Sequence, residues 1–267
     1  MLSLTNLQYW VLVLLVGSSI LGEVAMASPQ LMQRLVEEHE AILEDRRRAL
    51  PSLSDPFGVP AAARVVIENS REKIRSATPW KRNVVATIFW VGQKPTERNP
   101  HAKDKSAWDL NWIDSFGGSD HPEDREGWNP KGFVPKQTPF YVALPYNDVL
   151  TTGLHRPEAS EVIPWFWQQY RGDGITVCKG RWVAIHLAGK VCYAKWEDVG
   201  PFELDHWQYV FGNQAPRDNI NGAAGIDVSP AVRDFLRLKS GERVQWRFVD
   251  ERDVPVGPWK NWREGSN

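Results

Sequence analysis

The sequence has almost no net charge. Lys and Arg number 32 against 33 for Asp and Glu, so the formal net charge is −1. This balance provides no electrostatic footprint for nucleic acid or for an anionic membrane surface. A Gly-rich phosphate loop, a G-x-S-x-G elbow and an H-E-x-x-H helix are also missing from the sequence. We therefore expect no nucleic-acid partner and no cofactor.

Cysteine is scarce as well, with Cys178 and Cys192 as its two occurrences. Two cysteines in an exported chain favour a disulfide. A bridge requires Cα atoms within about 7 Å of each other. In a simple hairpin of residues 183–187 and 191–196, Cys192 is expected opposite Leu187. A bond to Cys178 then requires residues 175–178 to fold back, and both the bonded and the free state stay open.

Long apolar runs are limited to the N-terminus. Residues 10–21 form an apolar run too short for a comfortable membrane span, and Ala25-Met26-Ala27 resembles an A-x-A cleavage site. This pattern predicts a signal peptide over residues 1–27 and a periplasmic or secreted protein. The segment before the run carries no Lys or Arg, so an uncleaved anchor is the alternative. In that case the signal segment is the protein's contact with the membrane.

Residues 28–79 are predicted to form a helical N-terminal extension. Apolar residues punctuate a charged run over 29–48, and a second helical pattern covers 61–74. The Pro- and Ser-containing stretch 51–60 separates the two. We expect solvated helices here and no chemistry.

From Trp80 onward the chain turns to β-branched and aromatic runs. A long polar insertion over 92–136 interrupts them, and loops of this length are usually functional or mobile. Ser229-Pro230 is a favourable helix start, because Ser is a preferred N-cap and Pro a preferred first helical residue. The expected strands are 84–91, 139–145, 183–187, 191–196, a short one at 209–211, and 243–249.

Two segments each place one aspartate where a β-rich run breaks into a turn or a helix. E-D-V-G-P-F over 197–202 contains Asp198, and G-I-D-V-S-P-A-V over 225–232 contains Asp227. A carboxylate at a strand end can be held rigidly and still face a groove, as acid–base chemistry and ligand binding require. The alternative is that each aspartate only bonds nearby backbone N–H groups.

Aromatic residues are the second functional candidate, since the chain has 14 Trp. A buried Trp needs a partner for its N–H, so many Trp indicate partly exposed aromatic surfaces. Flat aromatic faces suit sugar rings, although core packing explains single Trp residues equally well. Trp108, Trp112 and Trp207 are candidates to line a groove, and His206, between Asp205 and Trp207, can reach the same groove with a tunable charge. His121 with its acidic neighbours fits no metal-ligand template, so we predict no metal site.

The order of these motifs resembles the double-psi β-barrel of rare lipoprotein A-like proteins. That family carries D-R-G-P-F and later I-D-L-S at a helix start, as D-V-G-P-F and I-D-V-S do here. The runs V-V-A-T-I-F-W-V and F-Y-V-A-L-P resemble its opening strand and its strand ending in Leu-Pro. The likeness covers roughly residues 80–250. It implies a mainly β domain over 80–262, built as a six-stranded double-psi β-barrel with an N-terminal helical extension and a long loop insertion.

The same barrel occurs in expansins, glycoside hydrolase family 45 and membrane-bound lytic transglycosylase A. By that resemblance Asp227 matches an aspartate that acts as general acid or contacts polysaccharide. A helix N-terminus favours the anion, so a proton donor there needs burial or a carboxylate neighbour. Asp198 could be that neighbour, and Asp205 is a looser match to the transglycosylase.

The resemblance has gaps at the catalytic residues of rare lipoprotein A. Tyr141 stands where that family has its histidine, Asp109 alone could replace its aspartate, and no glutamate matches. Tyr141 and Asp109 are therefore candidates for substrate binding. We expect an exported cell-envelope protein that acts on or binds polysaccharide such as peptidoglycan. If active, it is a lytic transglycosylase or a glycoside hydrolase-like enzyme; the alternative is a non-catalytic wall-binding or structural module.

Overall fold

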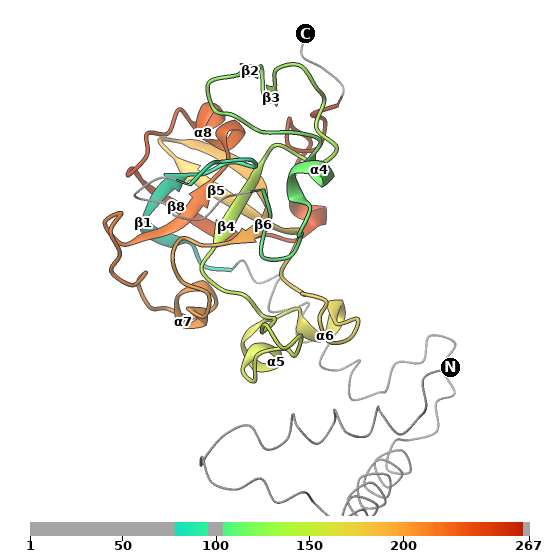
Figure 1. Cartoon of the computed structure of the whole chain (residues 1–267). Helices are drawn as coiled ribbons and strands as arrows, with labels where there is room; N and C mark the ends of the chain where they lie inside the picture. The colour runs from blue at the N-terminus through green and yellow to red at the C-terminus, as the bar shows by residue number, and fades with distance from the viewer. Residues whose placement is uncertain (1–77, 96–103, 264–267) are drawn as a thin grey trace, which may run out of the picture. The chain divides into compact units, whose positions relative to one another are not determined.

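The computed structural model describes residues 78–95 and 104–263, which include a closed six-stranded β-barrel (Figure 1). The strand order around the barrel is β1-β7-β4-β6-β5-β8. The strands are β1 Lys81–Ile88, β4 Tyr141–Leu144, β5 Arg181–Leu187, β6 Lys190–Val199, β7 Ala224–Val228 and β8 Arg243–Phe248. The predicted mainly β class with a six-stranded barrel is confirmed.

The barrel has internal two-fold symmetry in its strand pairing. Strands β1 and β7 pair in parallel, as do β4 and β6, and every other neighbouring pair is antiparallel. Exchanging β1, β4 and β5 for β6, β7 and β8 leaves this set of pairs unchanged. A mixed barrel of this order is compatible with a double-psi β-barrel.

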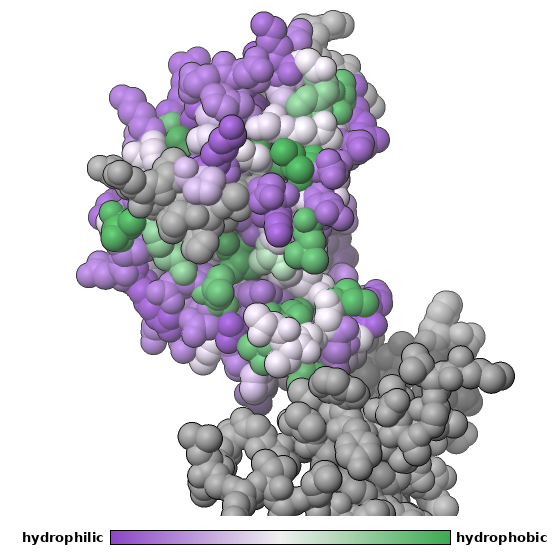
Figure 2. Space-filling model, in the orientation of Figure 1, coloured by the Kyte–Doolittle hydropathy of each residue, from purple (hydrophilic) through white to green (hydrophobic). Residues whose placement is uncertain are grey.

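Alternation along β6 shows how the strands fill the barrel interior. Cys192, Ala194 and Trp196 are buried, whereas Tyr193 and Lys195 between them are partly exposed. Tryptophans at 112, 165, 196 and 246 are fully buried, and the indole N–H of Trp196 donates to the Asp198 carbonyl at 2.8 Å. In the view of Figure 2 hydrophilic side chains surround small apolar patches. Core packing therefore explains much of the tryptophan content.

A tight hairpin joins β5 to β6. Leu187 pairs with Lys190, and the turn residues Ala188 and Gly189 have φ of 48° and 81°, as two-residue type I′ turns require. Cys192 consequently lies opposite Ile185, and the predicted pairing with Leu187 is wrong. Both cysteine thiols are buried and free, so no disulfide links β6 to the segment before β5.

The expected strand at 209–211 is wrong. Residues Trp207–Val210 form helix α7, and the fifth barrel strand is β7. Tyr209 packs its ring on Trp246, with 6.0 Å between ring centroids, and accepts that indole's N–H at 2.7 Å. Tertiary packing thus holds a segment of high β-propensity as a helical turn.

The helix start at Ser229-Pro230 is confirmed. Helix α8 runs over Pro230–Leu236, and the Ser229 side chain accepts the Val232 N–H. The same hydroxyl donates to the Pro139 carbonyl at 2.6 Å and accepts the Tyr141 N–H at 3.2 Å. Ser229 therefore ties the I-D-V-S segment to β4 as well as capping the helix.

The insertion after β1 packs against the outside of the barrel. It holds helix α4 Trp112–Phe116 and the short strands β2 Arg125–Glu126 and β3 Asn129–Pro130. A second apolar cluster joins it to β1 and β4, comprising Phe89, Val91, Trp112, Phe116, Tyr141 and Ala143. The insertion is thus partly structured.

The remaining described elements are short, and the sequence did not predict them. Helices α5 Ala159–Val162 and α6 Phe166–Gln169 lie between β4 and β5, and a 3-10 turn covers Glu251–Asp253. The predicted signal peptide, the helices at 29–48 and 61–74, and most of the extension over 28–79 lie outside the described residues. Within the described ranges no helix is long and apolar enough to cross a membrane.

Candidate carboxylate site

The two aspartate motifs meet on the outer face of the barrel. Asp227 on β7 and Asp198 on β6 both pair with Ala143 of β4, which lies between them. Ala143 belongs to the apolar cluster under the insertion, so this row of residues faces outward. Two strand spacings separate the aspartate Cα atoms by about 10 Å. The structure therefore brings the two catalytic candidates onto one face.

Asp227 is partly exposed and has defined neighbours. Thr87, its register partner on β1, donates a hydroxyl hydrogen bond to Asp227 Oδ1. Gly200 of the D-V-G-P-F turn lies beside the other oxygen, because a Cβ on Gly200 would be 3.5 Å from Oδ2. With φ of 148° Gly200 has a backbone that L side chains rarely adopt. The turn thus approaches Asp227 without covering it.

Asp198 is held by the insertion. Its side chain is buried, with 2% exposure, and its Oδ1 accepts the Ala107 N–H at 2.8 Å. A backbone hydrogen bond to a carboxylate is charge-assisted and anchors the donor segment. Asp198 therefore attaches the start of the insertion to β6.

Glu197 is a buried carboxylate that the sequence analysis missed. Its exposure is 9%, and burial raises the pKa of its side chain to about 7, against the lowering effect of Lys179 and Lys195. Among residues 78–95 and 104–263 no hydrogen bond or ion pair to this carboxylate occurs. A glutamate directly before the D-V-G-P-F motif was the available signal. The sequence alone does not show that the pairing of β6 with β4 shifts register at Glu197.

Asp109 lies close to this carboxylate. Its Oδ2 is 3.4 Å from Lys179 Nζ, and its Oδ1 accepts hydrogen bonds from the Ser115 hydroxyl and the Asn111 N–H. Its charge also contributes to the raised pKa of Glu197. This predicted binding residue is thus placed at the edge of the carboxylate row.

Tyr141 is not available to a ligand. Its side chain is 1% exposed; its hydroxyl donates to Asp120 Oδ2 at 2.9 Å and accepts the Val91 N–H at 3.0 Å. Asp120 is itself fully buried and ion-paired with Arg125. The expectation that Tyr141 binds substrate is therefore not supported by its position, because both hydrogen-bonding sites of the hydroxyl are used inside the protein.

Of the three tryptophan candidates, one lies near the Asp227–Ala143–Asp198 row and two do not. Trp108 follows Ala107, remains partly exposed, and packs edge-on against Trp196 at 5.5 Å between ring centroids. Trp112 is fully buried, with its indole N–H donating to Gln137, so it cannot line a groove. Trp207 is half-buried against the barrel core in α7. Of the three, only Trp108 borders the contact with Asp198.

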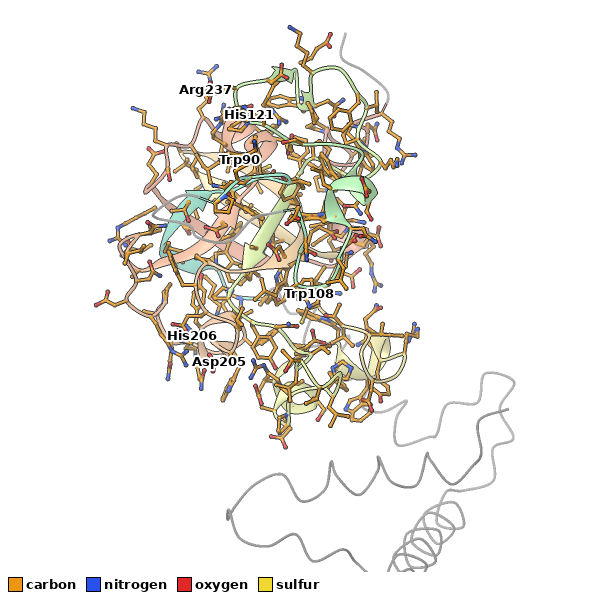
Figure 3. All side chains as sticks on the ribbon, in the orientation of Figure 1. Trp90, Trp108, His121, Asp205, His206 and Arg237 are labelled. Carbon is orange, nitrogen blue, oxygen red and sulfur yellow. The ribbon has the colours of Figure 1, made fainter. Side chains whose placement is uncertain are left out.

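Asp205 and His206 lie together beside α7, and Trp90 and His121 lie at the other end of the view (Figure 3). Asp205 is exposed and pairs with Arg217 at 2.8 Å. His206 is only 1% exposed, and burial lowers its pKa. The expected approach of His206 to a groove is not seen, because its side chain is enclosed.

No known protein family matches this sequence, and no curated protein matches it either. Within the part of the chain that the structure describes, no group of three or more His, Cys, Asp or Glu side chains could hold a metal ion. The charged groups placed at the site are the carboxylates of Asp227, Asp198 and Glu197 and the ammonium groups of Lys179 and Lys195.

Proposed function

We propose that the protein acts on cell-envelope polysaccharide, such as peptidoglycan glycan strands, through the carboxylates on the outer face of its barrel. Asp227 is the reacting carboxylate, and the fold is that of the rare lipoprotein A-like double-psi barrels. The reaction is that of a glycoside hydrolase-like enzyme. The signal-like N-terminus supports a periplasmic or secreted location.

One observation carries this proposal: both aspartate motifs converge on one row across β7, β4 and β6, with Asp227 partly exposed. Glycoside hydrolysis uses paired carboxyl groups on either side of the scissile bond. The strand positions of the two aspartates are about 10 Å apart, so side chains at these positions can approach the spacing that paired carboxyl groups have in inverting glycosidases.

Aromatic side chains near the row support a sugar ligand. Phe202, two residues after Gly200, is 46% exposed, and Trp108 is partly exposed beside the Asp198 contact. Aromatic faces offer apolar area that packs against the C–H faces of sugar rings. Trp108 already directs its indole N–H to Asn147 at 2.8 Å, which fixes its ring.

A second candidate is a non-catalytic wall-binding or structural module. The burial of Asp198 and its hydrogen bond to the Ala107 N–H favour it, because that aspartate has a structural role whether or not chemistry occurs.

The test uses the full chain on purified peptidoglycan sacculi and a soluble β-glucan, comparing wild type with Asp227→Asn. Asp218→Asn is the matched control, since Asp218 is exposed in the 212–223 loop. Release of soluble fragments that Asp227→Asn abolishes and the control retains supports the enzyme. Binding without release, unchanged in Asp227→Asn and weakened by Trp108→Ala, supports the binding module. If the protein neither binds glycan nor releases soluble fragments, both candidate functions are refuted.

A further inference from the structure

We propose that Glu197 is the proton donor of this site, a neutral carboxylic acid that protonates the departing glycosidic oxygen. This inference rests on the proposed function and assigns a role to a residue outside both aspartates. With Asp227 as the base that activates water, it predicts hydrolysis with inversion at the anomeric carbon.

The register of β6 turns Glu197 toward the same face as the aspartates. Trp196 pairs with Val142 and Asp198 pairs with Ala143, so Glu197 is an extra residue without a partner on β4. Such a β-bulge re-aims a side chain and is common beside active sites. Trp196 is in the barrel core, whereas Lys195 lies opposite Tyr141 of the outer cluster. Strand alternation therefore places Glu197 outward, and the bulge places Asp198 outward directly after it.

The surroundings of Glu197 favour its neutral form. Nine-tenths of the residue is buried, and no group among the described residues donates a hydrogen bond to its carboxylate. Asp198, one residue away, receives the Ala107 N–H instead. A carboxyl group that loses hydration without gaining a donor stays protonated at higher pH. The raised pKa of about 7 agrees with that environment.

Asp109 offsets part of the lysine charge near Glu197. Lys179 Nζ lies 3.4 Å from Asp109 Oδ2, so the lysine charge is shared with that carboxylate. An unshared ammonium beside Glu197 would favour the ionised form. Burial is the largest effect on the pKa of Glu197 and raises it, the charges of Lys179 and Lys195 lower it, and the charge of Asp109 raises it.

The step conserves atoms and charge. The Glu197 proton moves to the glycosidic oxygen as the bond from that oxygen to the anomeric carbon breaks. Water attacks the same carbon from the opposite face and loses its proton to Asp227, whose anionic form the Thr87 hydroxyl stabilises. Solvent then returns a proton to Glu197 and takes one from Asp227. Inverting enzymes place their carboxyl groups about 6.5–9.5 Å apart, which side chains on strands about 10 Å apart can reach.

The test substitutes Glu197→Gln, which keeps the shape and removes the acid, with the exposed Glu126→Gln of β2 as control. On unactivated glycan the rate should fall at least about 100-fold, the usual range for losing a general acid. Wild-type activity should decline above a pH near 7, and this alkaline limb should disappear in Glu197→Gln. Activity on an aryl glycoside with an acidic leaving group should survive, because that group needs no proton. Retained glycan cleavage with an unchanged alkaline limb would overturn the assignment.

A second measurement separates this inference from the proposed function. Carboxyl ¹³C NMR of the full chain should show one glutamate titrating near pH 7 that is missing from Glu197→Gln. A Glu197 that titrates near its ordinary value refutes the proton-donor assignment even if glycan is cleaved. Wild type without cleavage refutes the enzyme instead, whatever the titration shows.

Discussion

Removing the hydroxyl of Tyr141 tests whether this residue is structural, as its burial indicates. The substitution Tyr141→Phe keeps the ring and deletes one oxygen. The ring contacts to Phe89, Trp112 and Phe116, at 5.4, 5.3 and 5.8 Å between centroids, therefore stay in place. No cavity of side-chain size forms, so any loss of stability comes from hydrogen bonding.

Two buried groups lose their partner in this variant. Asp120 Oδ2 loses a donor at 2.9 Å, and the Val91 N–H loses an acceptor at 3.0 Å. A hydrogen bond to a charged group is worth about 1.5–3 kcal/mol, and an orphaned buried N–H costs about 1–3 kcal/mol. Because Asp120 keeps its ion pair with Arg125, we take the lower part of the summed range, about 3 kcal/mol.

Urea unfolding followed by tryptophan fluorescence measures this difference, and the melting temperature should fall by about 6–12 °C for a protein of this size. Tyr193→Phe is the control, because Tyr193 is partly exposed and packs on Trp259 through its ring. It should cost under about 0.5 kcal/mol, as surface changes do. If Tyr141→Phe unfolds like wild type, the buried hydroxyl is not what joins the insertion to β1 and β4.

Three further predictions concern other buried groups. The pKa of Glu197 is raised to about 7 in the folded protein, so its contribution to stability is fully present below about pH 4.5 and is lost as pH rises through 7. Urea titrations should show this loss, on the order of 3 kcal/mol, and Glu197→Gln should remove it. Asp198→Ala leaves the Ala107 N–H unpaired, so it should lower the free energy of unfolding by about 1–2 kcal/mol and speed proteolysis at 104–111. Asp198→Asn keeps an acceptor and should have a smaller effect. If Asp198→Ala resists protease as well as wild type does, the anchoring role is contradicted. Cys178 and Cys192 are buried and free, and burial raises the pKa of both thiols; they should react with a thiol reagent only on unfolding, and a change of melting temperature with reductant would argue for a disulfide.

Local sequence patterns specified much of the barrel. Runs of β-branched and aromatic residues located β1, β4, β5, β6 and β8, because such side chains pack well on the pleated surface of a sheet. Ser229-Pro230 located α8 for an equally local reason, since the cap uses a hydroxyl three residues from its N–H donor. Asp198 and Asp227 were identified as site candidates because each stands where a β-rich run breaks into a turn or a helix.

Tertiary contacts decided the rest. Residues 207–210 have strand-like composition, yet Tyr209 is held against Trp246 in a helical turn, and β7 completes the barrel instead. The burial of Tyr141 depends on Asp120, which comes from the insertion. A single sequence contains no information on which distant groups will share such a contact.

The carboxylate site shows the same division. The chain order placed Asp198 and Asp227 in two motifs, and the resemblance of those motifs to a known barrel placed them near each other. Glu197 acquired its environment only from the β-bulge opposite Val142 and Ala143 and from burial beside Lys179. A bulge and the burial of a side chain both depend on how strands pair across the barrel. The raised pKa of Glu197 is therefore a property of the folded protein, and its neighbours in the sequence do not determine it.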